Sequence, residues 1–88
     1  MKYFAAILTI GDSSKSQEYR PHHLAFLERG ERVGLIFARG RFADGAGGLI
    51  IYRTESLEEA RRLAVQDPYV SSGARILELH EWDMLLTQ

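Results

Sequence analysis

The sequence predicts an α+β fold in which four antiparallel strands form one sheet and two helices cover one of its faces. Three observations lead to this prediction. The apolar pattern changes between strand-like and helix-like periods in the order β-α-β-β-α-β. Glycine-rich turn residues join the second and third strand-like segments as a hairpin. A length of 88 residues suits one domain, which we expect to span residues 1–88.

The first strand is expected over residues 2–10, which are apolar at nearly every position. The segment GDSSKS breaks this run, and QEYRPHHLAFLERG follows with Leu24 and Leu27 at helical spacing. Proline is tolerated in the first turn of a helix and is costly in its interior. We therefore expect the regular helix to begin near residues 19–21 and to end at Gly30.

The remaining elements follow from short local signals. RVGLIFARGRF predicts a second strand, ADGAGG a turn and LIIYRT a third strand. SLEEARRLAVQ predicts the second helix, because Ser56 and Glu59 have the spacing of a capping box. The apolar face of that helix consists of Leu57, Ala60, Leu63 and Ala64. ARILELHEW alternates in polarity and predicts the fourth strand.

Two helices can cover only one face of such a sheet, yet the first strand is apolar on both. Phe4, Ala6 and Leu8 alternate with Tyr3, Ala5 and Ile7. At about 25 cal/mol per Å² of apolar area, leaving several of these side chains in water would forfeit several kcal/mol. We therefore expect a homodimer in which the open faces of two sheets pack together.

Composition excludes several classes of function. The formal net charge is -1 and no block of like charges is present, which argues against a nucleic-acid partner. The chain has no cysteine, so it has no thiol nucleophile or thiolate metal site, which fits the reducing cytoplasm. The opening MKYFAAILTIGDSS has no signal-peptide cleavage site, and no segment approaches the about 18 apolar residues of a membrane-spanning helix. We expect a cytoplasmic protein without a membrane partner.

Two segments, RPHHLAFL and DPY, contain the residues best suited to acid–base chemistry. Adjacent histidines on a helix point about 100° apart. His23 shares the apolar face with Leu27, whereas His22 is expected to face water. A histidine in this position can act as a general base when a carboxylate bonds to one ring nitrogen and fixes the tautomer. Asp67 is the candidate carboxylate, although only the fold can bring the two residues together.

Both candidates have an ordinary structural interpretation. Aspartate is a favoured N-cap and proline a favoured first helical residue, so DPYVSSG could begin a short helical turn capped by Asp67. His23 could be a partly buried imidazole bonded to a backbone carbonyl. Both interpretations stay open at this point.

Other candidate sites are weaker. Arg39 and Arg41 share one face of the second strand and could bind an acidic substrate, although solvated charges are the commoner explanation. His22 and His23 lack the i, i+4 spacing of a helical two-histidine metal site. The glycines of GRFADGAGG lack the lysine of a phosphate loop. We expect neither a metal nor a cofactor.

Taken in order, RPHHLAFL, ARGRFADGAGGLIIY, SLEEARRLAVQDPYV and the late Trp82 resemble the YciI family over nearly the whole chain. That family consists of small ferredoxin-like proteins that form dimeric α+β barrels. The resemblance implies an active site centred on His23 and Asp67. One departure is that Gly40 is followed by Arg41, where the family usually has proline, so the rim of the pocket is expected to differ.

The resemblance also gives an expectation about chemistry. Related dimeric α+β barrels include muconolactone isomerases, small monooxygenases and a dehydrochlorinase acting on a chlorinated hydroxyquinol, so the fold does not name the substrate. We expect a lyase, isomerase or dehydrochlorinase in which His23 moves a proton and Asp67 orients it. Arg20 and Tyr69 would hold a small anionic or phenolic substrate. The alternative is a non-catalytic dimeric module that binds a metabolite or a partner.

Overall fold

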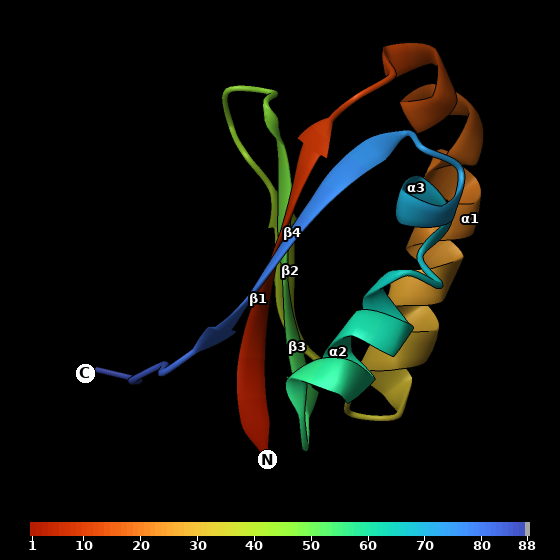
Figure 1. The fold of residues 1–88 in the computed structure, drawn as a ribbon. Helices are drawn as coiled ribbons and strands as arrows, with labels where there is room; N and C mark the ends of the chain where they lie inside the picture. Colours follow the sequence, from red (N-terminus) through yellow and green to blue (C-terminus); the bar gives the residue numbers. More distant parts are fainter. Residues whose placement is uncertain (88) are drawn as a thin grey trace.

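The computed structural model describes residues 1–87 as a sheet packed against a layer of helices (Figure 1). The elements are β1 (Lys2–Ile10), α1 (Ser13–Arg32), β2 (Ile36–Arg41), β3 (Gly47–Thr54), α2 (Leu57–Ala64), α3 (Pro68–Ser71) and β4 (Arg75–Trp82). The strands pair antiparallel in the order β2-β3-β1-β4, and the helices lie on one face. The predicted fold is confirmed, with α3 as an additional turn of helix.

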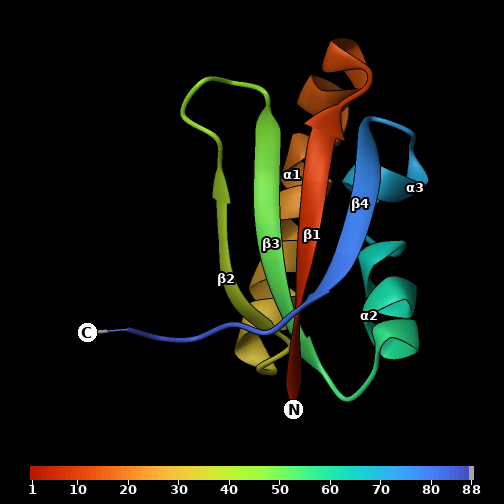
Figure 2. The same ribbon diagram turned by 60° about the vertical axis from the view of Figure 1, so that its left-hand side comes forward.

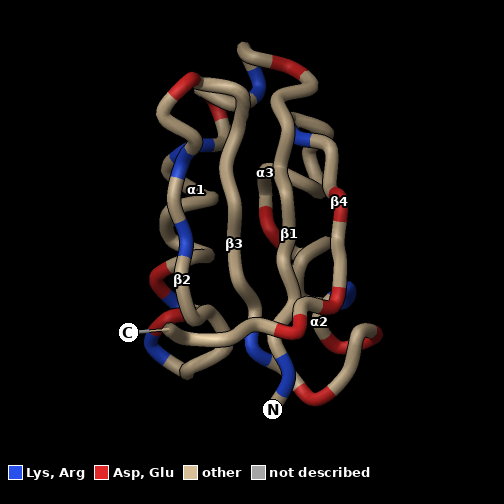
Figure 3. The backbone as a smooth tube through the Cα atoms, turned by 90° about the vertical axis from the view of Figure 1, so that its left-hand side faces the viewer, with Lys and Arg blue, Asp and Glu red and all other residues tan. Residues whose placement is uncertain are grey.

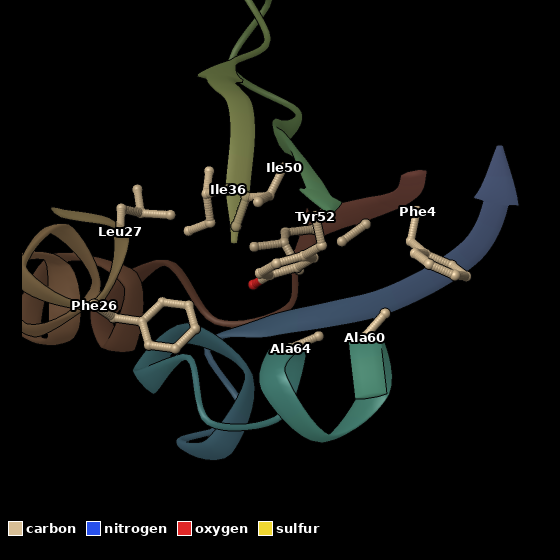
Figure 4. Packing of buried hydrophobic residues seen from close by; sticks show 10 residues of the cluster. Phe4, Phe26, Leu27, Ile36, Ile50, Tyr52, Ala60 and Ala64 are labelled. Atoms are coloured by element: carbon tan, nitrogen blue, oxygen red, sulfur yellow. The ribbon is translucent and has the colours of Figure 1, made fainter. Parts of the chain in front are cut away.

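The covered face of the sheet carries the core. Phe4, Ala6, Leu8, Ile50 and Tyr52 point from β1 and β3 toward the helices, and each is 3% exposed or less. Phe26 and Leu27 of α1 and Ala60 and Ala64 of α2 pack onto them (Figure 4). Of the predicted apolar face of α2, Ala60, Leu63 and Ala64 pack against this core, whereas Leu57 is exposed.

The opposite face of the sheet is apolar along its two central strands. Tyr3, Ala5 and Ile7 of β1 lie beside Leu49 and Ile51 of β3 on this face. Figure 3 shows it from the front, with no charged residue along the central parts of β1 and β3. The expectation that the first strand is apolar on both sides is therefore confirmed, and the homodimer stays a prediction.

Helix α1 begins earlier than the proline suggested, so the predicted start near residues 19–21 is wrong. Asp12 caps the helix by accepting from the N–H of Lys15, and Pro21 lies inside it. Contacts with distant residues stabilise the first turns: the N–H of Asp12 donates to the carbonyl of Ala74, and Ser16 is 8% exposed. These contacts are formed only in the folded chain, so they outweigh the local cost of an interior proline.

Three glycine assignments also change. Gly30 does not end α1, which continues to Arg32; a Cβ at Gly30 would lie 2.5 Å from the side chain of Ile36. This glycine therefore permits close packing between α1 and β2. Gly47 and Gly48, assigned to the turn, are the first two residues of β3, and a Cβ at Gly47 would lie 2.0 Å from the carbonyl oxygen of Leu8.

The hairpin between β2 and β3, the first turns of α1 and the α3 segment gather around the same end of the sheet (Figures 1 and 2). These segments come from distant parts of the sequence. Their convergence places the candidate residues of α1, α3 and β2 within reach of one another.

No helix within residues 1–87 is long and apolar enough to cross a membrane. The cytoplasmic location stays a prediction.

Candidate functional site

The packing of α1 against α3 brings His23 and Asp67 into direct contact. The His23 Nδ1 atom lies 2.8 Å from Oδ1 and 2.9 Å from Oδ2 of the Asp67 carboxylate. The Asp67 side chain is fully buried, and the His23 side chain is 12% exposed. The partner of His23 is therefore a carboxylate, and the backbone-carbonyl interpretation is wrong.

Asp67 also caps α3, so the cap interpretation is correct, and the cap is compatible with the contact to His23. Its Oδ1 atom accepts a hydrogen bond from the N–H of Tyr69 at 2.9 Å, and Pro68 is the first residue of the short helix. The DPY sequence fixes this local geometry, because an Asp-Pro pair favours the start of a helical turn. The cap orients the carboxylate, and the packing of α1 then presents His23 to it.

This contact determines which nitrogen of the neutral ring carries the proton. An ionised carboxylate only accepts hydrogen bonds, so Nδ1 of His23 is the donor and Nε2 keeps a lone pair. Within residues 1–87, Nε2 of His23 has no hydrogen-bond partner. All side-chain nitrogen and oxygen atoms that are buried in this range do have a partner, so Nε2 is not one of the buried atoms. Nε2 is therefore accessible, as a general base must be. His22 is exposed, as expected.

A cavity of about 450 Å³ lies against this pair, between α1, α3 and the β2–β3 hairpin. The residues that line it include His23, Tyr69, Arg20, Arg39, Arg41 and Arg75. All of the predicted substrate-binding residues therefore border one cavity, which also has His23 in its wall. No aspartate or glutamate within residues 1–87 lines it, whereas four arginines do.

Arg39 differs from the other cavity arginines because it forms a salt bridge with a glutamate. Its Nε and Nη2 atoms donate to Glu31 of α1 at 3.0 and 3.3 Å. These hydrogen bonds lower the pKa of the Glu31 carboxyl and raise the pKa of Arg39. Arg39 and Arg41 share the covered face of the sheet, as predicted from their parity, because they pair with Ile50 and Gly48.

Comparison with known proteins identifies the family. Residues 1–83 match the sequence profile of the YCII-related domain. The chain belongs to the YCII-related family. The uncharacterized protein YjpA of Bacillus subtilis (strain 168) is 33% identical over 82 residues, which cover 93% of this chain and 96% of YjpA. The predicted resemblance is thereby confirmed.

A solved structure shares the fold of this YCII-related chain. It is 5-chloro-2-hydroxyhydroquinone dehydrochlorinase (TftG) from Burkholderia phenoliruptrix AC1100, in complex with 2,5-dihydroxybenzoquinone. The two structures align with a TM-score of 0.77 and 20% sequence identity, over 92% of this chain and 93% of that chain. At this level of identity the likeness concerns the fold alone.

Sequence reasoning missed two residues of the site, Arg75 and Ser16. The Tyr69 ring stacks on the His23 ring, with centroids 3.8 Å apart and planes 14° apart, and the guanidinium carbon of Arg75 lies 4.3 Å from the Tyr69 centroid. Ser16 accepts a hydrogen bond from Nε of Arg75 at 3.0 Å. Arg75 has the same strand parity as the inward-facing Leu77, and this pattern could have identified it. No sequence signal distinguishes Ser16.

The described residues also bear on metal binding. No group of three or more histidine, aspartate or glutamate side chains within residues 1–87 is arranged to hold a metal ion.

Proposed function

We propose that this YCII-related protein is a small enzyme of the lyase, isomerase or dehydrochlorinase type. His23 is its general base and Asp67 orients that base. The observation that carries the proposal is the 2.8 Å contact between His23 Nδ1 and a fully buried carboxylate, with the accessible Nε2 beside a cavity. This arrangement suits proton transfer, because the carboxylate stabilises the imidazolium that forms.

The chemistry is balanced without a cofactor. In an elimination, Nε2 of His23 takes a proton from the substrate, the freed electron pair forms a double bond and the leaving group departs with its bonding pair. In an isomerisation, the imidazolium returns the proton at another carbon. Asp67 stays ionised throughout and keeps the ring in one orientation. Neither route needs a nucleophile or an electron acceptor.

The cavity supports a small anionic substrate. Its volume of about 450 Å³ lies within the range of about 300–1,000 Å³ that small-molecule sites occupy. Arg20 and Arg41 border it, and arginine is well suited to carboxylate or phenolate oxygens. The ligand in the TftG structure, 2,5-dihydroxybenzoquinone, is a planar ring bearing only oxygen substituents. An aromatic or phenolic acid is therefore the substrate class we propose.

The test uses solvent deuterium as a general reporter of proton transfer. Purified protein in D₂O is incubated with lactone acids and halogenated hydroquinones, including 5-chloro-2-hydroxyhydroquinone. NMR measures deuterium incorporation, and chloride release is measured in parallel. His23→Asn should lower the rate by about 10²- to 10⁴-fold. His22→Asn is the matched control, because it changes the neighbouring exposed histidine.

The outcome separates the two functions considered from the sequence. Full turnover in a folded His23→Asn variant would contradict the mechanism. A wild-type protein that binds members of the panel without any deuterium exchange or elimination would instead support a non-catalytic binding module.

We also propose a homodimer through the open face of the sheet. Phe37, Ile76 and Trp82 add to the apolar side chains of β1 and β3 there, and they are 43%, 63% and 45% exposed. Light scattering at micromolar concentration should give the mass of two chains. Ile7→Lys on this face should yield monomers, whereas Leu57→Lys on exposed α2 should not. A monomeric wild-type protein would contradict the proposal.

A further inference from the structure

Arg75 is a charged residue on the side of the sheet that faces the helices. It pairs with Ile10 at the start of β4 and has the orientation of Leu77 and Leu79, which pack against the core. A guanidinium group stays charged throughout the physiological pH range. A partly buried arginine at this position therefore needs hydrogen-bond partners, or an anion, to compensate for lost hydration.

Two contacts hold the Arg75 side chain in place. Its Nε donates to the hydroxyl oxygen of Ser16 at 3.0 Å, and Ser16 is 8% exposed. Its guanidinium carbon lies 4.3 Å from the centroid of the Tyr69 ring, in the range of a cation–π contact. The guanidinium is therefore oriented before any ligand binds, and little side-chain entropy is left to lose.

The terminal nitrogens of Arg75 are not used by these contacts. Within residues 1–87, neither Nη atom has a hydrogen-bond partner, and no carboxylate forms a salt bridge with Arg75. No buried side-chain nitrogen in that range lacks a partner, so both Nη groups are accessible. Since Arg75 lines the cavity, its free donors are available to a ligand there.

The other cavity arginines lack this combination. Glu31 occupies two donor atoms of Arg39. Arg20 and Arg41 are exposed, and neither makes a side-chain hydrogen bond to another residue in the described part of the chain. Within residues 1–87, Arg75 alone among the four is oriented by contacts that leave both Nη atoms free and has no carboxylate partner.

Tyr69 sets the separation between Arg75 and His23. The imidazole and the guanidinium both lie over the same ring, at 3.8 and 4.3 Å from its centroid. Two planar groups cannot occupy one face of a ring at such distances, so they lie on opposite faces. A ligand that touches both must pass the edge of Tyr69, and a six-membered ring with an acidic group has suitable length.

We propose that Arg75 anchors the acidic group of the substrate through its two Nη atoms, and that this group is planar: a carboxylate or a ring enolate. The inference rests on the proposed function and specifies which part of the substrate the site recognises. A planar acid can accept two parallel hydrogen bonds from the guanidinium fork. The rest of the molecule then extends past Tyr69 toward Nε2 of His23.

Binding of benzoate tests the proposal, with benzamide as the neutral probe of similar shape. In ¹H–¹⁵N spectra, the Arg75 Nε–Hε cross-peak is identified by its loss in Arg75→Met. Benzoate should shift this peak saturably in the wild-type protein, and benzamide should not. Arg75→Met should weaken benzoate binding by about tenfold or more, judged from backbone amide shifts. Arg62→Met removes an exposed α2 arginine and should change Kd by less than about twofold.

A second variant keeps the test decisive if Arg75→Met does not fold. Ser16→Ala retains the guanidinium but releases its Nε, and it should weaken benzoate binding by about fivefold. Equal binding of benzamide and benzoate would overturn the proposal. So would an unmoved Arg75 peak at roughly 50 mM benzoate, or wild-type affinity in folded Arg75→Met.

Failure of this inference can be distinguished from failure of the proposed function. Benzoate binding at Arg75 without any deuterium exchange on the substrate panel would contradict catalysis alone. Turnover that depends on His23 but not on Arg75 would contradict the anchoring role alone.

Discussion

Substitutions of Asp67 separate the two roles of its buried carboxylate. Oδ1 accepts from the Tyr69 N–H, while both carboxylate oxygens lie within 2.9 Å of His23 Nδ1. In Asp67→Asn, an amide oxygen can keep the cap, but an NH₂ group replaces Oδ2. Two N–H groups would then face each other, so the ring proton should move from Nδ1 to Nε2. The variant should keep its fold and lose its base.

The expected destabilisation follows from the donors that each substitution leaves unpaired. Asp67→Ala removes the acceptor for both the Tyr69 N–H and the His23 ring at a fully buried position. It should cost about 3–5 kcal/mol of unfolding free energy. Asp67→Asn keeps the cap and loses only the charge-assisted hydrogen bond to His23, which should lower the unfolding free energy by about 1.5–3 kcal/mol. In a domain of this size, each kcal/mol lowers Tm by about 4–8 °C.

Urea unfolding and ¹⁵N NMR of the imidazole measure these effects. A double-mutant cycle of His23→Ala and Asp67→Ala should give a coupling free energy of at least about 1 kcal/mol. Spectra of the neutral ring should show the proton on Nδ1 in the wild-type protein and on Nε2 in Asp67→Asn. The reasoning is refuted if the wild-type ring is protonated on Nε2, or if the cycle is additive within about 0.5 kcal/mol.

Two further predictions concern the scaffold. Burial, and to a lesser extent the Asp67 charge, raise the pKa of Tyr52; an unfolded tyrosine ionises near pH 10, so wild-type stability should fall above about pH 10. In urea unfolding from pH 10 to 11, the wild type should lose about 1 kcal/mol of unfolding free energy relative to Tyr52→Phe. Equal losses in the two proteins would contradict this. Gly30→Ala should cost about 1 kcal/mol despite better helix propensity, because its Cβ would meet Ile36. Adding Ile36→Val should relieve part of that loss, whereas a Gly30→Ala protein more stable than wild type would count against the packing argument.

The elements were predictable where the signal was local. The doubly apolar pattern of residues 2–10 gave β1 with its observed bounds, and Ser56 accepts from the Glu59 N–H as the capping-box spacing implied. Asp67 caps α3 for the same reason, because its partner is two residues away. Both partners of such an interaction lie within a few residues of each other, so a short stretch of sequence is enough to predict it.

Local rules failed where a distant contact competed with them. Pro21 favoured a late helix start, but the bonds of Asp12 and Ser16 to residues near Ala74 extend α1 to Ser13. Gly30 has the residue type of a terminator, but its small size serves packing against Ile36. In both cases the deciding partner lies outside the helix: Ala74 is far along the chain, and Ile36 meets Gly30 only because β2 packs against α1.

By itself, the sequence determined the order of strands and helices, the apolar central strands and the family resemblance, because these depend on periodicity and short motifs. Only the tertiary structure decided that His23 meets Asp67, that one cavity gathers the arginines, and that Arg75 is held by Ser16 and Tyr69. The physical reason is distance along the chain. A hydrogen bond acts over about 3 Å in space, and the packing of α1 against α3 and β4 determines which side chains come that close.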